Sequence, residues 1–228
     1  MKVLAIETST MLGGVAIADE KGLIAETRLN VKSTHSERLM ATIDEQLRQS
    51  GMALGDIDVF AVASGPGSFT GLRIGLSTAK GLCYATDKPL VMVPTLDAFA
   101  RNFPFSKHPV CVMLDARRGE VYAAVFRWDR GFIKLLDEVS VAPEDLFRDV
   151  DSPVVLAGEG ALVYRERLLG MLGERAMFAP LEMMVPSPAH VAALGLEKAL
   201  RSEFTEVSAA EPFYIRKSEA EVKWSQKL

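Results

Sequence analysis

Three short apolar runs at the start of the chain most restrict the folds open to it. They cover 3–6, 15–18 and 23–29, and the turn between the first two contains Gly13-Gly14. Short runs rich in branched apolar residues, bounded by glycine and polar turns, predict strands. The first two runs therefore predict a β-hairpin, and the third predicts a further strand after it.

A first helix follows these strands. Its predicted start is a capping box, Thr34-x-x-Glu37, and it ends at Gly51. Its apolar residues recur at helical spacing and form one face: Leu39, Met40, Ile43 and Leu47. The expected elements after it are a buried strand at 59–63, a long helix at 70–85, a strand at 90–93 and a short helix from Thr95.

The second half of the chain repeats this order in part. A strand at 110–114 ends in Asp115, as the first strand ends in Glu7, and a return strand follows at 121–126. Pro143 can open a helix, and a strand at 154–157 leads into Gly158-Glu159-Gly160. Two copies of a strand-strand-strand-helix-strand-helix unit predict the duplicated α/β fold of actin-like ATPases (the sugar kinase and Hsp70 class), with a shortened second half.

The predicted domain organisation has three parts. Residues 1–102 form the first subdomain and residues 103–186 the smaller second one. Residues 187–228 form a C-terminal helix, opened by Ser187-Pro188, and a polar tail with Arg216, Lys217, Lys223 and Lys227. We expect this last part to pack back on the first subdomain.

Composition excludes some classes of function. The chain has 228 residues and a net charge of −4, which argues against a dedicated nucleic-acid binder with its concentrated basic surface. No apolar run resembles a signal peptide or approaches the length of a membrane span, so we expect a cytoplasmic protein without a membrane partner. Cys83 and Cys111 lie in apolar contexts and are expected to be buried, reduced thiols.

Two polar segments lie where proteins of this fold bind phosphate. Glu7-Thr8-Ser9-Thr10 follows the first strand, and Gly65-Pro66-Gly67-Ser68 lies between a strand and the start of the long helix. The alternative is that the first is a polar turn and the second a turn that needs positive φ, with Thr70 as a helix cap. No Gly-Lys-Ser/Thr occurs. The candidate vestigial nucleotide or phosphate site comprises Glu7, Thr8, Ser9, Gly65, Gly67, Ser68, Asp115, Gly158 and Gly160.

Small residues recur along the long helix at four-residue spacing: Gly71, Gly75 and Ala79. Glycine inside a helix costs about 1 kcal/mol relative to alanine, so a packing reason is expected. The stripe fits either packing against the chain's own helix or sheet or a subunit interface, and the pattern does not decide between them.

Several segments, in this order, resemble the TsaB (YeaZ) family. They are Met1–Ser9, Gly14–Ala16, His35–Leu39, Gly65–Gly75, Asp115–Tyr122, Gly158–Ala161 and Pro212–Arg216. The resemblance spans nearly the whole chain, and the glycine-proline-glycine segment is its most specific part.

The resemblance implies a cytoplasmic bacterial protein that is not itself an enzyme. It would be a partner subunit required for threonylcarbamoylation of the adenosine beside the tRNA anticodon, and would bind and activate its catalytic paralogue TsaD. The ATPase TsaE joins that complex, and TsaC supplies the activated intermediate. Members also form homodimers when alone, and they contact tRNA mainly through the complex. No cofactor of the chain's own is implied, with ATP or ADP bound only in the assembled complex.

The resemblance also makes a prediction about a metal site. In TsaD this site is formed by two histidines on the first helix. Here that helix offers His35 without a second histidine four residues on, so the metal site is expected to be absent. Family members bind the paralogue through the first two helices. The predicted partner interface therefore comprises Leu39, Met40, Ile43, Leu72, Gly75, Leu76 and Ala79.

Two other functions stay open. One is a free-standing ATP-dependent phosphotransferase or hydrolase that uses the cleft between the two halves, with Glu7, Gly67, Asp115 and Gly158 at its centre. The other is a metallopeptidase, which the isolated positions of His35, His108 and His190 disfavour.

Overall fold

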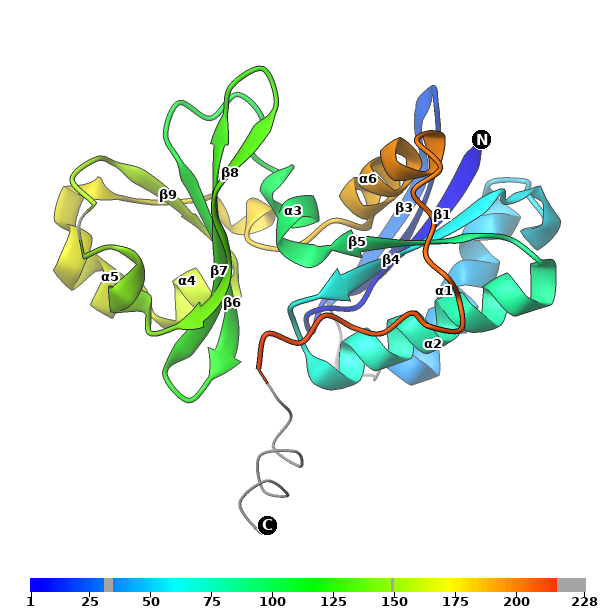
Figure 1. Cartoon of the computed structure of the whole chain (residues 1–228), viewed down its shortest axis with the longest axis horizontal. Coiled ribbons are helices and arrows are strands. Elements are labelled where there is room, and N and C mark those ends of the chain that lie inside the picture. Colours follow the sequence, from blue (N-terminus) through cyan, green and yellow to red (C-terminus); the bar gives the residue numbers. More distant parts are fainter. Residues whose placement is uncertain (31–34, 149, 217–228) are drawn as a thin grey trace, which may run out of the picture.

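The chain folds into two lobes, each built on a five-stranded sheet (Figure 1). The computed structural model describes residues 1–30, 35–148 and 150–216. The predicted cap residue Thr34 and the tail residues Lys217, Lys223 and Lys227 therefore lie outside the described residues.

The first sheet has the strand order β3-β2-β1-β4-β5. Its antiparallel part comprises β1 (Lys2–Glu7), β2 (Gly13–Asp19) and β3 (Gly22–Leu29), and its parallel part adds β4 (Val59–Gly65) and β5 (Leu90–Pro94) to β1. The helices of this lobe are α1 (His35–Gln49), α2 (Phe69–Thr86), the short α3 (Thr95–Ala100) and a one-turn 3₁₀ helix at Leu54–Asp56. The predicted hairpin, third strand and two helices are all present.

The second sheet repeats the order as β8-β7-β6-β9-β10, with the same parallel and antiparallel pairs. Its strands are β6 (Val110–Arg117), β7 (Glu120–Trp128), β8 (Phe132–Val141), β9 (Val154–Ala157) and β10 (Ala176–Phe178), and α4 (Glu159–Val163) and α5 (Arg165–Leu172) follow β9. Because both halves share one topology, the predicted duplicated α/β fold is confirmed.

The second half is shorter where the first half has α1. Pro143 opens a four-residue 3₁₀ helix, Pro143–Leu146, instead of an α-helix. Two further 3₁₀ turns, Gly173–Arg175 and Leu181–Met183, flank β10. The sequence patterns did not identify β8, α5 or β10, because their exposed and buried residues do not form a clear apolar run.

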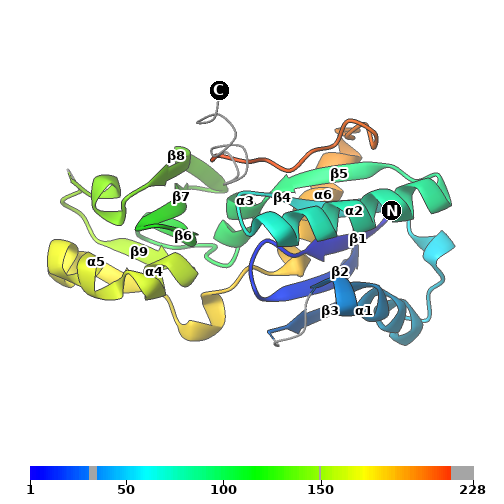
Figure 2. The same cartoon turned by 90° about the horizontal axis from the view of Figure 1, so that it is seen from below.

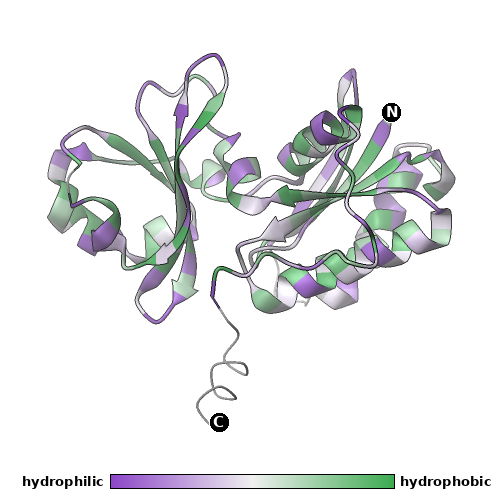
Figure 3. Cartoon of the chain, viewed as in Figure 1, coloured by the Kyte–Doolittle hydropathy of each residue, from purple (hydrophilic) through white to green (hydrophobic). Residues whose placement is uncertain are grey.

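Residues from both ends of the chain form the core of the first lobe. Alternate residues of β1 point to opposite faces: Leu4 and Ile6 pack against α1 and α2, whereas Val3 and Ala5 pack against α6 (Pro188–Leu200). Figure 3 shows hydrophobic residues concentrated in the strands of both sheets. The last helix among the described residues thus covers one face of the first sheet, so the chain has to return to the first lobe after completing the second.

Polar contacts fix the start of α6. Ser187 occupies the predicted N-cap position, but its hydroxyl donates to Glu26 Oε1 at 2.6 Å instead of accepting from the helix. The same carboxylate oxygen accepts from the backbone N–H of Ala189 at 3.1 Å, so Glu26 of β3 caps α6 from a distant part of the chain.

A segment at the end of the described chain, residues 205–216, runs back across the first lobe to the second; we call it the strap (Figure 2). Thr205 pairs with Leu90, and the Lys80 ammonium donates to the carbonyls of Ser208 and Ala210. At its far end, Arg216 donates to the carbonyl of Ala116 in the second lobe at 2.9 Å. The strap therefore ties α2 to the hairpin between β6 and β7.

Both cysteines are buried, free thiols, Cys83 in the first lobe and Cys111 in the second. Burial raises the pKa of Cys111 to about 12. Within residues 1–30, 35–148 and 150–216, no helix has the length and apolar character needed to cross a membrane.

Candidate functional site

The turn after β1 and the glycine loop before α2 touch directly. The Thr8 hydroxyl donates to the carbonyl of Gly71 at 2.8 Å, and the backbone N–H of Ser68 donates to the carbonyl of Ser9 at 2.6 Å. A Cβ on Gly67 would lie 2.5 Å from Ser9 O, and one on Gly71 would lie 2.0 Å from Thr8 O. The glycines of this loop are therefore required for backbone-to-backbone contact with the first strand.

Glu7 is a fully buried carboxyl group at the centre of this contact. Its Oε1 accepts from the backbone N–H of Ser9 at 2.6 Å, and its Oε2 has no hydrogen-bond partner among the described residues. Burial raises the pKa of Glu7 to about 7, against the opposing effect of the Ser9 hydrogen bonds. Near neutral pH this carboxyl group consequently carries only part of its charge.

Three N–H groups of this turn and loop already have acceptors within the chain. Ser9 N–H donates to Glu7, Ser68 N–H to Ser9, and Gly71 N–H to the Ser68 hydroxyl at 3.3 Å. A phosphate group at this turn would have to replace these internal bonds. The turn after β1 (Thr8 and Ser9) and the loop before α2 (Gly67, Ser68 and Gly71) therefore form a closed structural contact, which we call a joint.

The second half has an equivalent joint. Gly158 has a φ of 102°, and a Cβ there would lie 2.1 Å from Met113 O, so β6 and the turn after β9 also meet backbone to backbone. The N–H of Gly158 points to the Met184 sulfur at 3.3 Å. Gly160 is buried against Met113 and Leu114.

Asp115 lies beside this second joint. Its Oδ1 accepts from the Arg117 backbone N–H at 2.9 Å and from the Tyr164 hydroxyl at 3.3 Å, and its Oδ2 lies 3.1 Å from the Arg117 guanidinium. Among the described residues, no group of three His, Cys, Asp or Glu side chains is arranged to hold a metal ion.

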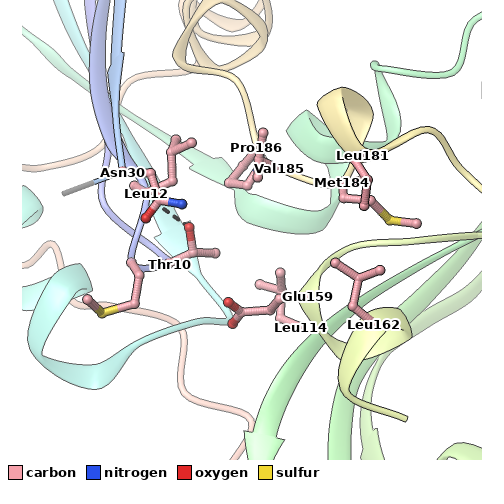
Figure 4. Close-up of a pocket in the computed structure, with 11 residues that line it drawn as sticks. Thr10, Leu12, Asn30, Leu114, Glu159, Leu162, Leu181, Met184, Val185 and Pro186 are labelled. Atoms are coloured by element: carbon pink, nitrogen blue, oxygen red, sulfur yellow. Dashed lines mark hydrogen bonds between the residues drawn. The ribbon is translucent and has the colours of Figure 1, made fainter. Parts of the chain in front are cut away.

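A cavity of about 200 Å³ lies between the two lobes (Figure 4). It is lined by Thr10, Met11, Leu12, Asn30, Leu114, Glu159, Leu162, Leu181, Met184, Val185 and Pro186. The candidate nucleotide residues do not line it; they lie in the two joints on either side. The sequence patterns did not group these lining residues, since they come from a strand, helices and loops that are far apart in the chain and share no motif.

The chemistry of this cavity does not suit a polyphosphate. Its charged lining residue is Glu159, whose pKa is raised by burial and by the nearby Asp115 carboxylate. Most of the remaining lining side chains are apolar. A negatively charged group bound here would meet a carboxylate and few hydrogen-bond donors.

The structure places six of the seven predicted interface residues inside the chain's own core: Leu39, Ile43, Leu72, Gly75, Leu76 and Ala79. Met40 is 55% exposed. A Cβ on Gly75 would lie 2.2 Å from the Thr8 hydroxyl, so the stripe of Gly71, Gly75 and Ala79 faces the first strand. Of the two explanations that the sequence left open for this stripe, internal packing is the one realised in the single chain.

A second stripe of small residues lies on the outer side of α2: Ser77, Gly81 and Ala85. All three are exposed, and the space around a Cβ on Gly81 is open. Tyr84 beside them is also exposed, and α1 packs next to α2 with Met40 and Ala41 exposed on its surface. The four-residue spacing is the signal that could have revealed this stripe from the sequence, although it is weaker here because the stripe holds a single glycine.

Comparison with known proteins identifies similar sequences along the whole chain. The profile of the family described as TsaD, tRNA N6-adenosine threonylcarbamoyltransferase, matches residues 23–224. The tRNA threonylcarbamoyladenosine biosynthesis protein TsaB of Bacillus subtilis (strain 168) is 33% identical over 228 residues, which is 98% of each chain. The protein of the same name from Escherichia coli (strain K12) is 29% identical and covers 96% of each chain.

Solved structures show the same relationship. YeaZ from Pseudomonas aeruginosa superposes with a TM-score of 0.80 at 27% identity, covering 93% of this chain and 99% of that one. The ethanolamine utilization protein EutJ from Carboxydothermus hydrogenoformans, with a TM-score of 0.56 at 14% identity over 86% of this chain and 90% of its own, shares the fold.

Proposed function

Because the chain belongs to the TsaB (YeaZ) family of tRNA threonylcarbamoyladenosine biosynthesis proteins, we propose that it is the non-catalytic subunit that binds and activates the catalytic paralogue TsaD. In this proposal the chain contributes a docking surface, and TsaD contributes the transfer chemistry. TsaE, and TsaC as the supplier of the activated intermediate, act in the same assembly, where ATP or ADP is bound. The chain forms a homodimer through the same surface when TsaD is absent.

The observation that carries this proposal is the outer face of α1 and α2. Ser77, Gly81 and Ala85 present no bulky side chain, so a partner helix can approach the α2 backbone closely. Tyr84 supplies exposed apolar area beside this stripe, and Met40 is exposed on the neighbouring helix α1. A small-residue stripe flanked by larger apolar side chains suits the close packing of two helices from each partner.

The rival function, an enzyme that uses the interlobe cleft, has less support. The N–H groups of Ser9, Gly71 and Gly158 are engaged within the chain, and the cavity between the lobes is mostly apolar with one carboxylate. Magnesium-dependent ATP turnover by the purified chain alone, lost on Glu7→Gln, would favour the rival instead.

The test is Gly81→Leu, measured by pull-down with TsaD and by tRNA modification with and without the chain. The leucine projects into open space, and replacing a helical glycine stabilises the helix by about 0.8 kcal/mol, so the chain should fold at least as well as the wild type. We expect binding to fall at least tenfold and modification to fall with it.

Two variants serve as controls. Gly170→Leu adds the same side chain to open space on α5 of the second lobe and should leave binding unchanged. Gly75→Leu would collide with Thr8 and should lower the stability of the chain by several kcal/mol. A folded Gly81→Leu chain with wild-type affinity for TsaD would show that the partner binds elsewhere, and modification that proceeds equally without the chain would refute the proposed role.

A further inference from the structure

Three aromatic rings form a connected row at the tip of the second lobe. The Phe105 and Trp128 ring centroids are 4.9 Å apart, as are those of Trp128 and Phe132, and both pairs meet edge to face. Phe132 is anchored against the core of the lobe, whereas Phe105 is 80% exposed. The row therefore extends from the core to solvent. The contact with Trp128 holds the Phe105 ring in place while most of its surface stays exposed.

The backbone at this tip is strained. Phe105 has a φ of 62° and Arg130, in the turn between β7 and β8, has a φ of 57°. The left-handed region is unfavourable for side chains larger than glycine, and an aromatic residue there is uncommon. Glycine at either position would relieve this strain.

Two cations follow rings of this row closely in the chain. Lys107 and Arg130 are two residues after Phe105 and Trp128, respectively, both are exposed, and neither takes part in an ion pair with another described residue. Arg127 is exposed too, but as the neighbour of Trp128 along β7 it lies on the other face of the sheet. The acidic residue of the turn is Asp129, which offsets one of these two charges. Lys134, behind the row, is already paired with Asp97 and Glu138.

From these observations we infer that the tip formed by Phe105, Lys107, Trp128 and Arg130 binds RNA, with an unpaired base stacked on Phe105 and the two cations on the flanking phosphates. An exposed aromatic ring beside unpaired cations is the arrangement that binds single-stranded nucleic acid. The inference rests on the proposed function, since the RNA it names is the tRNA of that reaction. It assigns this chain a direct contact with the substrate, separate from the α1 and α2 surface.

The test measures binding of the full chain, without TsaD, to a fluorescently labelled, unmodified tRNA transcript by anisotropy. We expect Phe105→Gly to weaken binding about tenfold, since the stacking of one base is removed, while the unfolding temperature stays the same or rises because glycine tolerates the φ of 62°. Lys107→Gln with Arg130→Gln should lower the slope of log affinity against log salt by about 0.7 for each phosphate that the protein no longer neutralises.

A direct readout of stacking comes from fluorescence. The chain has two tryptophans, so Trp224→Phe leaves Trp128 as the reporter. We expect tRNA to quench its emission, and Phe105→Gly to shift the quenching curve to higher tRNA concentration by the same factor as the anisotropy curve.

Phe204→Ala and Lys21→Gln are the matched controls. Phe204 is 45% exposed on the first lobe, and Lys21 is exposed in the turn between β2 and β3, so both should retain wild-type affinity for tRNA. No binding by the wild-type chain at low salt, or equal binding by the tip variants, would overturn the inference. Tip variants that bind tRNA normally but lose TsaD in the pull-down would show a protein-docking surface instead.

The outcomes separate this inference from the proposed function. Tip variants with unchanged tRNA affinity in a chain that still supports modification would refute the tip alone. Tight tRNA binding through the tip by a chain that modification does not require would refute the subunit role alone.

Discussion

At the scale of single residues, Glu7 shows how burial changes the chemistry of a common side chain. The sequence predicts Glu7 in a turn that could bind phosphate. In the structure its carboxyl group is buried in the joint between β1 and α2. One oxygen has an N–H donor and the other has none among the described residues. The cost of charging such a group makes the stability of the chain depend on pH.

We expect Glu7→Gln to remove much of this pH dependence. The folded-state pKa of about 7 lies above the ordinary value of 4.5, so the wild type loses stability as pH rises from 4.5 through 7. The loss amounts to about 3 kcal/mol, and glutamine avoids it while its amide oxygen still accepts from Ser9. Urea unfolding at pH 5 and pH 8 measures the difference.

The control for this prediction is Asp44→Asn, which changes an exposed carboxylate on α1 and should keep the wild-type pH profile. Equal stabilities of Glu7→Gln and wild type at pH 8 would mean that Glu7 is charged in the folded chain at little cost.

At the scale of elements, the strap connects the two lobes and packs on α2. Tyr214 stacks on Phe69 with ring centroids 4.6 Å apart, and its hydroxyl accepts from Arg73 Nε at 3.0 Å. Phe213 N–H donates to Ser64 O at 2.7 Å, beside Gly65. The strap thus covers the glycine loop and the first turn of α2.

Tyr214→Ala should destabilise the chain by about 1–2 kcal/mol, through loss of the ring stacking and of the Arg73 hydrogen bond. Tyr214→Phe retains the stacking and should lose less than half of that amount. Urea denaturation of the three chains measures both differences. An alanine variant as stable as the wild type would show that the strap lies on the surface without stabilising it.

At the scale of the whole molecule, the first lobe is completed by residues that follow the second lobe in sequence. Val191, Ala192 and Leu196 of α6 pack on the face of the first sheet that holds Val3 and Ala5. The two lobes therefore cannot be separated by a single cut in the chain without exposing a core surface.

A chain shortened to residues 1–186 should consequently lose the fold of its first lobe, although all five strands of that sheet remain. We expect rapid hydrogen exchange in β1 and β4 and reduced helix content by circular dichroism. A peptide of residues 187–216 added in trans should restore protection. Cooperative unfolding of the shortened chain at the wild-type temperature would show that the first lobe does not need α6.

The sequence by itself determined the class of fold and the family, because local patterns carry that information. Apolar runs and glycine turns specify strands and hairpins, and the order of elements occurs twice, so the duplicated α/β fold followed from the chain alone. The loop Gly65–Gly71 could likewise be recognised as a turn before a helix, since glycine has local effects on the backbone. The expected cap, Thr70, was wrong: Ser68 is the N-cap and accepts from Gly71 N–H, so Thr70 already lies in the first turn of α2.

Tertiary structure alone decided which side of each element is buried. The spacing of Gly71, Gly75 and Ala79 fits both a core and an interface, and only the position of Thr8 shows that this stripe faces inward. The same holds for Phe105, whose ring meets Trp128 from a separate loop, and for the interlobe cavity. Helical and strand periodicity fixes which residues share a face, but what covers that face depends on contacts between segments far apart in the chain.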